Sequence, residues 1–138
     1  MRVAERMRRH IAALDARDSI ARAAQLLAQE GVRAIPVVRR SALVRMIGET
    51  DVALARPSAA TTLTIGEVAG RLAQIPIGQV PSAGVPAVGP RTPITEAIRL
   101  MRAWRLAALP VVRGEELLGV LTEEDLLDLL IETIEDPS

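Results

Sequence analysis

The sequence contains no cysteine, and this absence excludes several kinds of structure and chemistry. A chain without thiols can form no disulfide framework, no thiolate metal site and no cysteine nucleophile. Histidine occurs once, as His10 beside Arg8 and Arg9, so we expect a solvated side chain there and not a catalytic base or metal ligand. No serine–histidine pairing or phosphate-cradling glycine loop is evident, so we do not expect an enzyme.

Aromatic residues and long apolar runs are also scarce. Phenylalanine and tyrosine are absent, and Trp104 alone cannot form the stacking platforms that single-stranded nucleic acids need. The 17 basic residues balance the 17 acidic ones, and the cluster Arg2, Arg6, Arg8 and Arg9 is expected to be a solvated face. Neither a signal peptide nor a bilayer-spanning run is evident. We therefore expect a cytoplasmic protein with no nucleic-acid and no membrane partner.

An internal repeat organises the chain. A shift of 74 positions aligns Pro36–Arg39 with Pro110–Arg113 and Asp51 with Asp125, without a gap over about forty residues. Such a repeat predicts one structural unit built twice. We expect a first repeat over residues 1–60, a connecting segment over 61–84 with a short helix at 64–73, and a second repeat over 85–138.

Each half shows the same order of predicted elements. Apolar residues at helical spacing indicate one helix in each half, and short β-rich runs follow it. A second helix is expected from about Glu49 and from about Glu123, and a short strand is expected before each first helix. The prediction is an α/β (α+β) fold of two β-α-β-β-α repeats. The apolar positions that define the first helices are Ile20, Ala23, Ala24, Leu27 and Ile94, Ala97, Ile98, Met101.

The second half combines Leu109-Pro110-Val111-Val112 with Gly119-Val120-Leu121-Thr122-Glu123-Glu124-Asp125, and residues 35–38 and 45–51 follow the same pattern. This doubled pattern resembles the CBS domain, and the resemblance covers nearly the whole chain. It implies a Bateman module, a tandem pair related by a pseudo-twofold axis, with a regulatory role and without catalysis. Such modules commonly form homodimers.

The resemblance also implies an adenosine-type ligand, AMP, ADP, ATP or S-adenosylmethionine, in a cleft between the repeats, with no cofactor required. Asp125 would accept hydrogen bonds from ribose hydroxyls, with Thr122 near ribose or phosphate. The same Thr-x-x-Asp spacing is typical of a helix start, and both roles are compatible. The full set that the resemblance assigns to ligand binding is Thr92, Ala107, Ala108, Leu109, Pro110, Gly119, Thr122 and Asp125.

The first half departs from this pattern. Arg45 stands where the second half has Gly119, and Gly48 stands where it has Thr122, whereas Asp51 keeps the aspartate. We expect a weaker second cleft there. Alternatively, the Arg45 side chain binds the phosphates of a ligand. The residues of this weaker cleft are Ile35, Pro36, Arg45 and Asp51.

The last helix carries a wide apolar stripe, which predicts a homodimer that shares this face. The alternative is that the stripe packs inside the monomer against the N-terminal segment, whose arginines would complement Glu132, Glu135 and Asp136. A ligand-free dimerisation or interaction module therefore remains a second candidate function. No metal site is expected, because no acidic loop has calcium-binding spacing. The stripe comprises Leu126, Leu127, Leu129, Leu130, Ile131 and Ile134.

Overall fold

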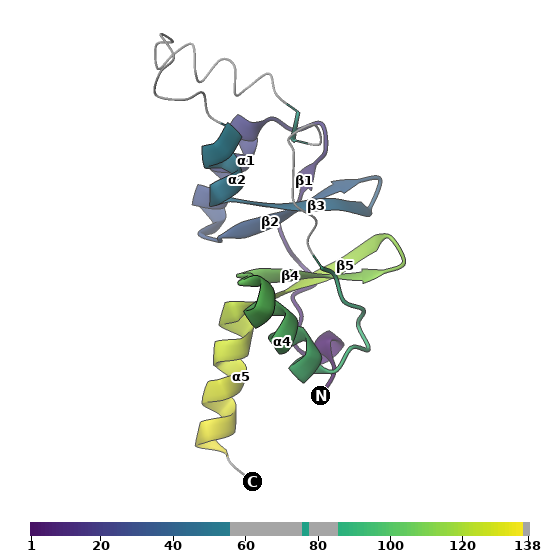
Figure 1. Ribbon diagram of the computed structural model, residues 1–138, viewed down its shortest axis with the longest axis vertical. Helices are drawn as coiled ribbons and strands as arrows, with labels where there is room; N and C mark the ends of the chain where they lie inside the picture. Colours follow the sequence, from purple (N-terminus) through teal and green to yellow (C-terminus); the bar gives the residue numbers. More distant parts are fainter. Residues whose placement is uncertain (56–75, 78–85, 137–138) are drawn as a thin grey trace. The chain divides into compact units, whose positions relative to one another are not determined.

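The computed structural model of the chain describes residues 1–55, 76–77 and 86–136 (Figure 1). The chain divides into two compact units, Ala12–Val85 and Met1–Ile11 together with Pro86–Ser138. Each unit combines strands with helices, which confirms the α+β class. The repeat boundaries expected at residues 60–61 and 84–85, and the helix expected at 64–73, lie outside the described residues.

The unit Ala12–Val85 contains a three-stranded sheet. Strand β1 is parallel to β2, and β2 is antiparallel to β3. Arg40 and Ser41 join β2 to β3 with positive φ angles of 51° and 69°, the handedness that suits a two-residue hairpin turn. The described elements of this unit are β1 (Leu14–Asp15), α1 (Ile20–Glu30), β2 (Ala34–Arg39), β3 (Ala42–Gly48) and α2 (Glu49–Ala55).

The second unit repeats this plan with an antiparallel β4–β5 hairpin and two helices. Strand β2 begins at Ala34 and β4 at Ala108, the expected separation of 74 positions. A bulge interrupts both hairpins at equivalent points, and this agreement confirms the repeat at the level of the backbone. The described elements are η1 (Val3–Glu5), α4 (Ile94–Trp104), β4 (Ala108–Arg113), β5 (Glu116–Thr122) and α5 (Glu123–Glu135).

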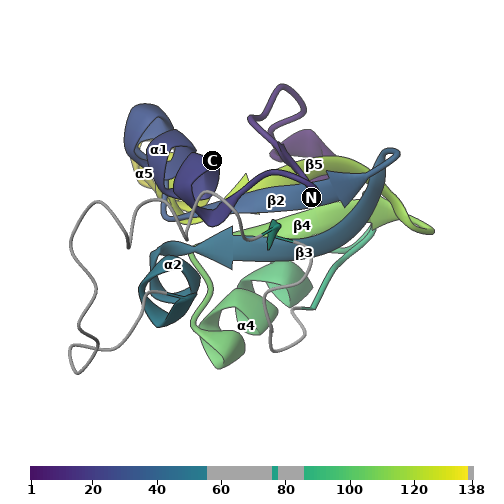
Figure 2. The same cartoon turned by 90° about the horizontal axis from the view of Figure 1, so that it is seen from above.

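Each unit has its own apolar core. Figure 2 shows α1 and α2 beside the end of the hairpin at which β2 begins and β3 ends. The helical stripes predicted from the sequence supply much of the burial, as Ile20 and Ala97 illustrate with no exposed surface. The first core contains Leu14, Ala16, Ile20, Ala23, Leu26, Leu27, Ile35, Val37, Ile47, Val52 and Ile77. The second contains Val3, Met7, Val88, Ile94, Ala97, Met101, Leu109, Val111 and Leu121.

Residues 1–11, called the N-terminal segment below, pack with the second repeat. Val3 and Met7 are buried in its core. The Val3 amide donates to the carbonyl oxygen of Thr92 at 2.9 Å. Arg8 forms a two-way backbone bridge with Val120 on β5, with N···O distances of 2.8 and 3.0 Å. The N-terminal segment therefore belongs structurally to the repeat that begins some eighty residues later in the sequence.

Candidate functional site

The candidate site centres on Asp125, at the start of α5. Its Oδ2 accepts hydrogen bonds from the Thr122 amide and from the Thr122 hydroxyl, both at 2.8 Å. The Asp125 amide in turn donates to Thr122 Oγ1 at 3.2 Å. These reciprocal bonds form a capping box, which satisfies amide groups that the first turn of a helix leaves unpaired. The predicted capping role of Thr122 is thus confirmed.

The backbone that precedes β4 lies beside this helix start. Ala108 is the register partner of Thr122 in the β4–β5 hairpin. The Glu123 amide donates to the carbonyl oxygen of Ala107 at 3.0 Å. Leu109 and Pro110 are fully buried, and the carbonyl oxygen of Pro110 accepts a hydrogen bond from the Val88 amide at 3.1 Å. The fold therefore brings Ala107, Ala108, Thr122 and Asp125 together, as the sequence pattern predicted.

Thr92 lies toward the opposite end of the same strands. Its hydroxyl accepts from the Gly89 amide at 3.1 Å, in the turn before α4. The residue before this glycine, Val88, accepts a hydrogen bond at 2.8 Å from the amide of Val112. Val112 is four residues beyond Ala108 on β4, roughly 13 Å along a strand. Within this unit, the contacts of Thr92 do not bring it to Thr122 and Asp125.

An arginine from the N-terminal segment occupies the other oxygen of the Asp125 carboxylate. Arg8 Nε donates to Asp125 Oδ1 at 2.8 Å, and Arg8 Nη2 lies 3.0 Å from Oε2 of Glu124. The hydrogen bond with Asp125 is the main cause that raises the pKa of Arg8 above its ordinary value. Arg6 forms a further ion pair with Glu132 on the same helix. Arg6 and Arg8, two members of the cluster expected to be a solvated face, thus both pair with α5, while their side chains stay 26% and 41% exposed.

Gly119 on β5 lies against the backbone of this segment. A Cβ atom built on Gly119 would overlap the carbonyl oxygen of Arg8 and would lie 3.3 Å from Sδ of Met7. Glycine at this position therefore permits the close approach of another stretch of protein backbone. The sequence pattern suggested that the glycine admits a ligand, and that assignment stays a prediction.

In the first repeat, the equivalent carboxylate also meets an arginine. Asp51 Oδ2 accepts from the Gly48 amide at 2.8 Å, and Asp51 Oδ1 lies 3.1 Å from Arg45 Nη2. Arg45 Nε also donates to the carbonyl oxygen of Met46 at 3.2 Å. The Arg45 side chain is 5% exposed, and that of Asp51 is 32% exposed. A buried guanidinium thus neutralises the carboxylate that the sequence assigns to a weaker cleft.

The two other residues predicted for that cleft lie on β2. Ile35 and Pro36 are buried, and their register partners on β3 are Ile47 and Met46. Ile35 packs in the first core, and Pro36 is buried within the sheet. The pairing of Val37 with Arg45 places both residues close to Arg45 along the hairpin.

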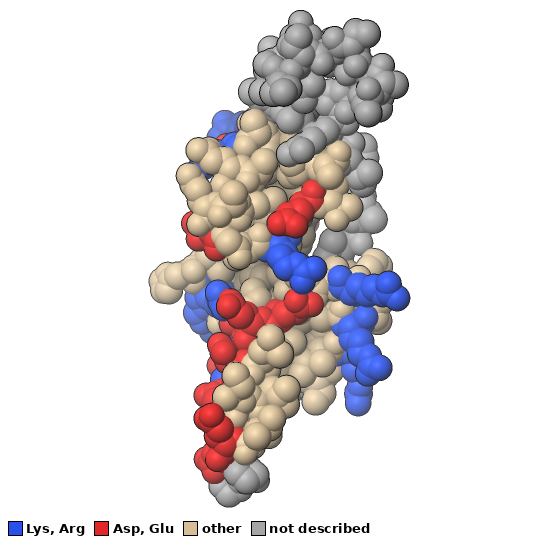
Figure 3. All heavy atoms as spheres, turned by 90° about the vertical axis from the view of Figure 1, so that its left-hand side faces the viewer, with Lys and Arg blue, Asp and Glu red and all other residues tan. Residues whose placement is uncertain are grey.

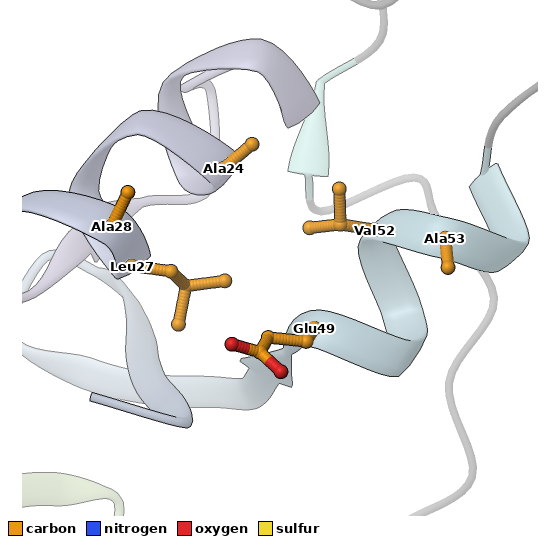
Figure 4. A pocket seen from close by; sticks show the side chains of 6 residues that line it. All are labelled: Ala24, Leu27, Ala28, Glu49, Val52 and Ala53. Carbon is orange, nitrogen blue, oxygen red and sulfur yellow. The ribbon is translucent and has the colours of Figure 1, made fainter. Parts of the chain in front are cut away.

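A hollow of about 340 Å³ opens between α1 and α2. Figure 4 shows the side chains of Leu27 and Val52 directed toward the space between the helices, with the carboxylate of Glu49 at its edge. None of the residues predicted for ligand binding lines this hollow. Its walls are Ala24, Leu27, Ala28, Glu49, Val52 and Ala53.

Helix α5 has an inner and an outer apolar face. Leu126 and Leu129 pack against the core of the second unit. The other four residues of the predicted stripe are exposed, up to 69% for Ile134. Figure 3 shows acidic side chains in a row along this helix, beside uncharged surface. The outer face of α5 comprises Leu127, Leu130, Ile131 and Ile134. The N-terminal segment pairs with Glu132 but does not cover this face.

Among residues 1–55, 76–77 and 86–136, no group of three histidine, cysteine, aspartate or glutamate residues is arranged to hold a metal ion. In the same described ranges, every helix is too short or too polar to cross a membrane.

The chain is similar to known proteins in sequence and in structure. The family model described as "CBS domain" matches residues 3–58 and again residues 77–132. A CBS domain-containing protein of Bacillus subtilis (strain 168), YhcV, is 31% identical over 124 residues, which span 90% of this chain and 81% of the relative.

Solved structures share the fold at lower sequence identity. AcuB from Vibrio cholerae superposes with a TM-score of 0.80 at 23% identity, over 98% of this chain and 93% of that chain. The CBS domain pair of protein MJ0100 was solved with 5-methylthioadenosine and S-adenosyl-L-methionine. It superposes with a TM-score of 0.74 at 19% identity, over 96% of this chain and 98% of that chain. CBSX2 in complex with AMP superposes with a TM-score of 0.75 at 21% identity, over 95% of this chain and 96% of that chain.

Proposed function

Because this chain belongs to the CBS domain family and carries two such domains in tandem, we propose that it is a regulatory module that binds an adenosine-type ligand. The observation that carries the proposal is the position of the Asp125 carboxylate, fixed at the start of α5 beside the backbone of Ala107 and Ala108. A carboxylate in this place offers acceptor oxygens next to backbone donors and acceptors.

The ligand class follows from the chemistry of these groups. Vicinal ribose hydroxyls are donors that suit the Asp125 carboxylate, and the Thr122 hydroxyl lies next to it. Backbone groups of residues 107–109 suit the edge of an adenine ring. MJ0100 with S-adenosyl-L-methionine and CBSX2 with AMP support S-adenosylmethionine and AMP as candidates, and ADP and ATP carry the same adenosine group. Ligand binding would favour one arrangement of the module and so act on a regulated protein partner.

The second motif is the proposed binding site, and the first is not. Asp51 lies beside the guanidinium of Arg45, whose side chain is 5% exposed and therefore held in place, whereas the side chain of Arg8 beside Asp125 is 41% exposed. Gly48 supplies no hydroxyl where the second repeat has Thr122. A ribose would therefore find fewer acceptors at the first motif.

Titration calorimetry with AMP, ATP and S-adenosylmethionine tests the assignment. Wild-type protein and Asp51→Ala should bind, whereas Asp125→Ala should not, because both variants lose a helix cap but only one loses the proposed ribose acceptor. Ligand at one hundred times its dissociation constant should also stabilise the wild-type fold by about 2.7 kcal/mol. Equal binding by Asp125→Ala and wild type would contradict the assignment.

A homodimer is the second part of the proposal. The outer face of α5 presents four exposed aliphatic side chains, and an apolar surface of this kind usually marks an interaction site. This face also favours the alternative function, a module that dimerises and holds a partner without any ligand. The titration separates the two, since the alternative predicts no heat and no stabilisation with any of the three ligands.

A further inference from the structure

The two motif aspartates use their oxygens in the same way. In each, Oδ2 accepts from the amide three residues earlier, at Gly48 or at Thr122, with a distance of 2.8 Å. In each, Oδ1 faces a guanidinium, from Arg45 at 3.1 Å and from Arg8 at 2.8 Å. The chain therefore supplies an arginine to both carboxylates, although the two arginines come from unrelated positions in the sequence.

The two arginines differ in how tightly the protein holds them. The Arg45 side chain is 5% exposed, whereas that of Arg8 is 41% exposed. The Arg8 backbone is fixed by its bridge with Val120, and buried Val3 and Met7 anchor the segment on either side of Arg6. Rotation of the Arg8 side chain alone can therefore free the Asp125 carboxylate, without removal of the N-terminal segment from the core.

We propose that the Arg8 side chain is an internal competitor for Oδ1 of Asp125, so that an adenosine ligand binds this carboxylate only as the guanidinium leaves. The inference rests on the proposed function, because it concerns the same site. Asp125 Oδ2 is already engaged with the amide and the hydroxyl of Thr122. A ribose diol, which donates two hydrogen bonds, therefore needs the oxygen that Arg8 holds.

This competition lowers the affinity of the site and ties ligand binding to the N-terminal segment. The guanidinium also pairs with Glu124, so its departure breaks two contacts with α5 at once. Hydrogen bonds to charged groups are among the stronger polar contacts in proteins. Removal of the Arg8 side chain should therefore tighten the binding of a ligand that competes through its hydroxyls alone.

Adenosine is the appropriate probe, because it carries the diol but no phosphate that could itself attract an arginine. We expect Arg8→Ala to bind adenosine about tenfold more tightly than wild type in calorimetric titrations. The matched control is Arg6→Ala, which removes an arginine of the same segment that pairs with Glu132 and not with Asp125. Its affinity for adenosine should equal that of wild type. Binding of 2′,3′-dideoxyadenosine, which lacks the diol, should not tighten in Arg8→Ala.

The outcomes separate this inference from the proposed function. Asp125-dependent binding that is equal in wild type and Arg8→Ala overturns the competition and leaves the proposed function standing. An equal gain for adenosine and 2′,3′-dideoxyadenosine also overturns it. The absence of adenosine, AMP, ATP and S-adenosylmethionine binding in both proteins overturns both proposals.

A measurement on the wild-type protein tests the same proposal without relying on the fold of a variant. The Nε–H resonance of Arg8 in a ¹⁵N-labelled sample reports the hydrogen bond to Asp125 directly. Saturation with adenosine should shift this resonance toward that of a solvated arginine, while the amide resonances of Val3 and Met7 stay in place. An Arg8 Nε–H signal that does not move at saturation contradicts the displacement.

Discussion

Gly119 on β5 lies so close to Arg8 that no side chain fits between β5 and the backbone of the N-terminal segment. Gly119→Ala should therefore push this segment away and lower the free energy of unfolding by about 1–3 kcal/mol. Gly89→Ala is the matched control, because its Cβ would meet the Val112 carbonyl oxygen at an ordinary 3.8 Å. Urea unfolding measures the loss of stability in each variant. Equal losses in Gly119→Ala and Gly89→Ala would count against the close approach.

The same alanine substitution at the two motif aspartates should have unequal effects on stability. Each removes a helix cap, at a cost of about 1 kcal/mol. Asp51→Ala also leaves the buried guanidinium of Arg45 without its carboxylate, whereas Arg8 remains in contact with solvent after Asp125→Ala. We expect Asp51→Ala to cost about 2 kcal/mol more than Asp125→Ala, since loss of an ion-pair partner costs more at a buried charge than at an exposed one. Similar unfolding midpoints and slopes for the two variants would contradict this difference.

The sequence predicts the elements of the fold well, because the repeat supplies each assignment twice. Helical spacing around Ile20 and Ile94 locates α1 and α4, and the Pro-Val-Val runs locate β2 and β4. Tertiary contacts decide what this pattern leaves open. Leu126 and Leu127 belong to one apolar stripe by spacing, yet the first packs inward and the second is exposed.

The part of the site that the sequence could not predict is the contact between Arg8 and Asp125. These residues are 117 positions apart, and no local spacing relates them. One signal was present, because a glycine inside a strand, here Gly119, often marks the close approach of another backbone. Which segment approaches is decided by the packing of Val3 and Met7 into the second core, a long-range property without a motif.

The C-terminal ends of α1 and α4 offer a test of backbone strain. Both end at a residue in the left-handed region, Gly31 with φ 63° and Arg105 with φ 54°. The Cβ atom of arginine makes this conformation unfavourable, whereas glycine has no Cβ and adopts it freely. We expect Arg105→Gly to raise the free energy of unfolding by about 0.5–1 kcal/mol.

The reciprocal variant serves as its control. Gly31→Arg should lower stability by about 1 kcal/mol, although a Cβ there has no atom within 4 Å, so the cost is conformational and not a clash. Thermal unfolding of the two variants and of the wild type shows whether each substitution raises or lowers stability. A loss of stability in Arg105→Gly would show that contacts of the arginine side chain outweigh the strain at this position.

The outer face of α5 predicts the oligomeric state. Leu127, Leu130, Ile131 and Ile134 are exposed along one side of the helix, and a second copy of the same face is the simplest apolar surface to cover them. Light scattering over a concentration series should therefore give the mass of a dimer. A monomer mass that persists at the highest concentration would contradict the interface.

Single charges placed on this face should dissociate the dimer without unfolding the chain. Leu130→Glu and Ile134→Glu each remove an exposed aliphatic side chain, and twofold symmetry makes every substitution count twice. Burial of one such side chain is worth about 1.5–3 kcal/mol, so the dimer dissociation constant should rise at least about a hundredfold. Thr133→Glu adds the same charge to the same helix outside this face and should leave the dimer intact. Circular dichroism verifies the fold in all three variants, and dissociation of Thr133→Glu to the same extent would show that total charge, and not the apolar face, controls association.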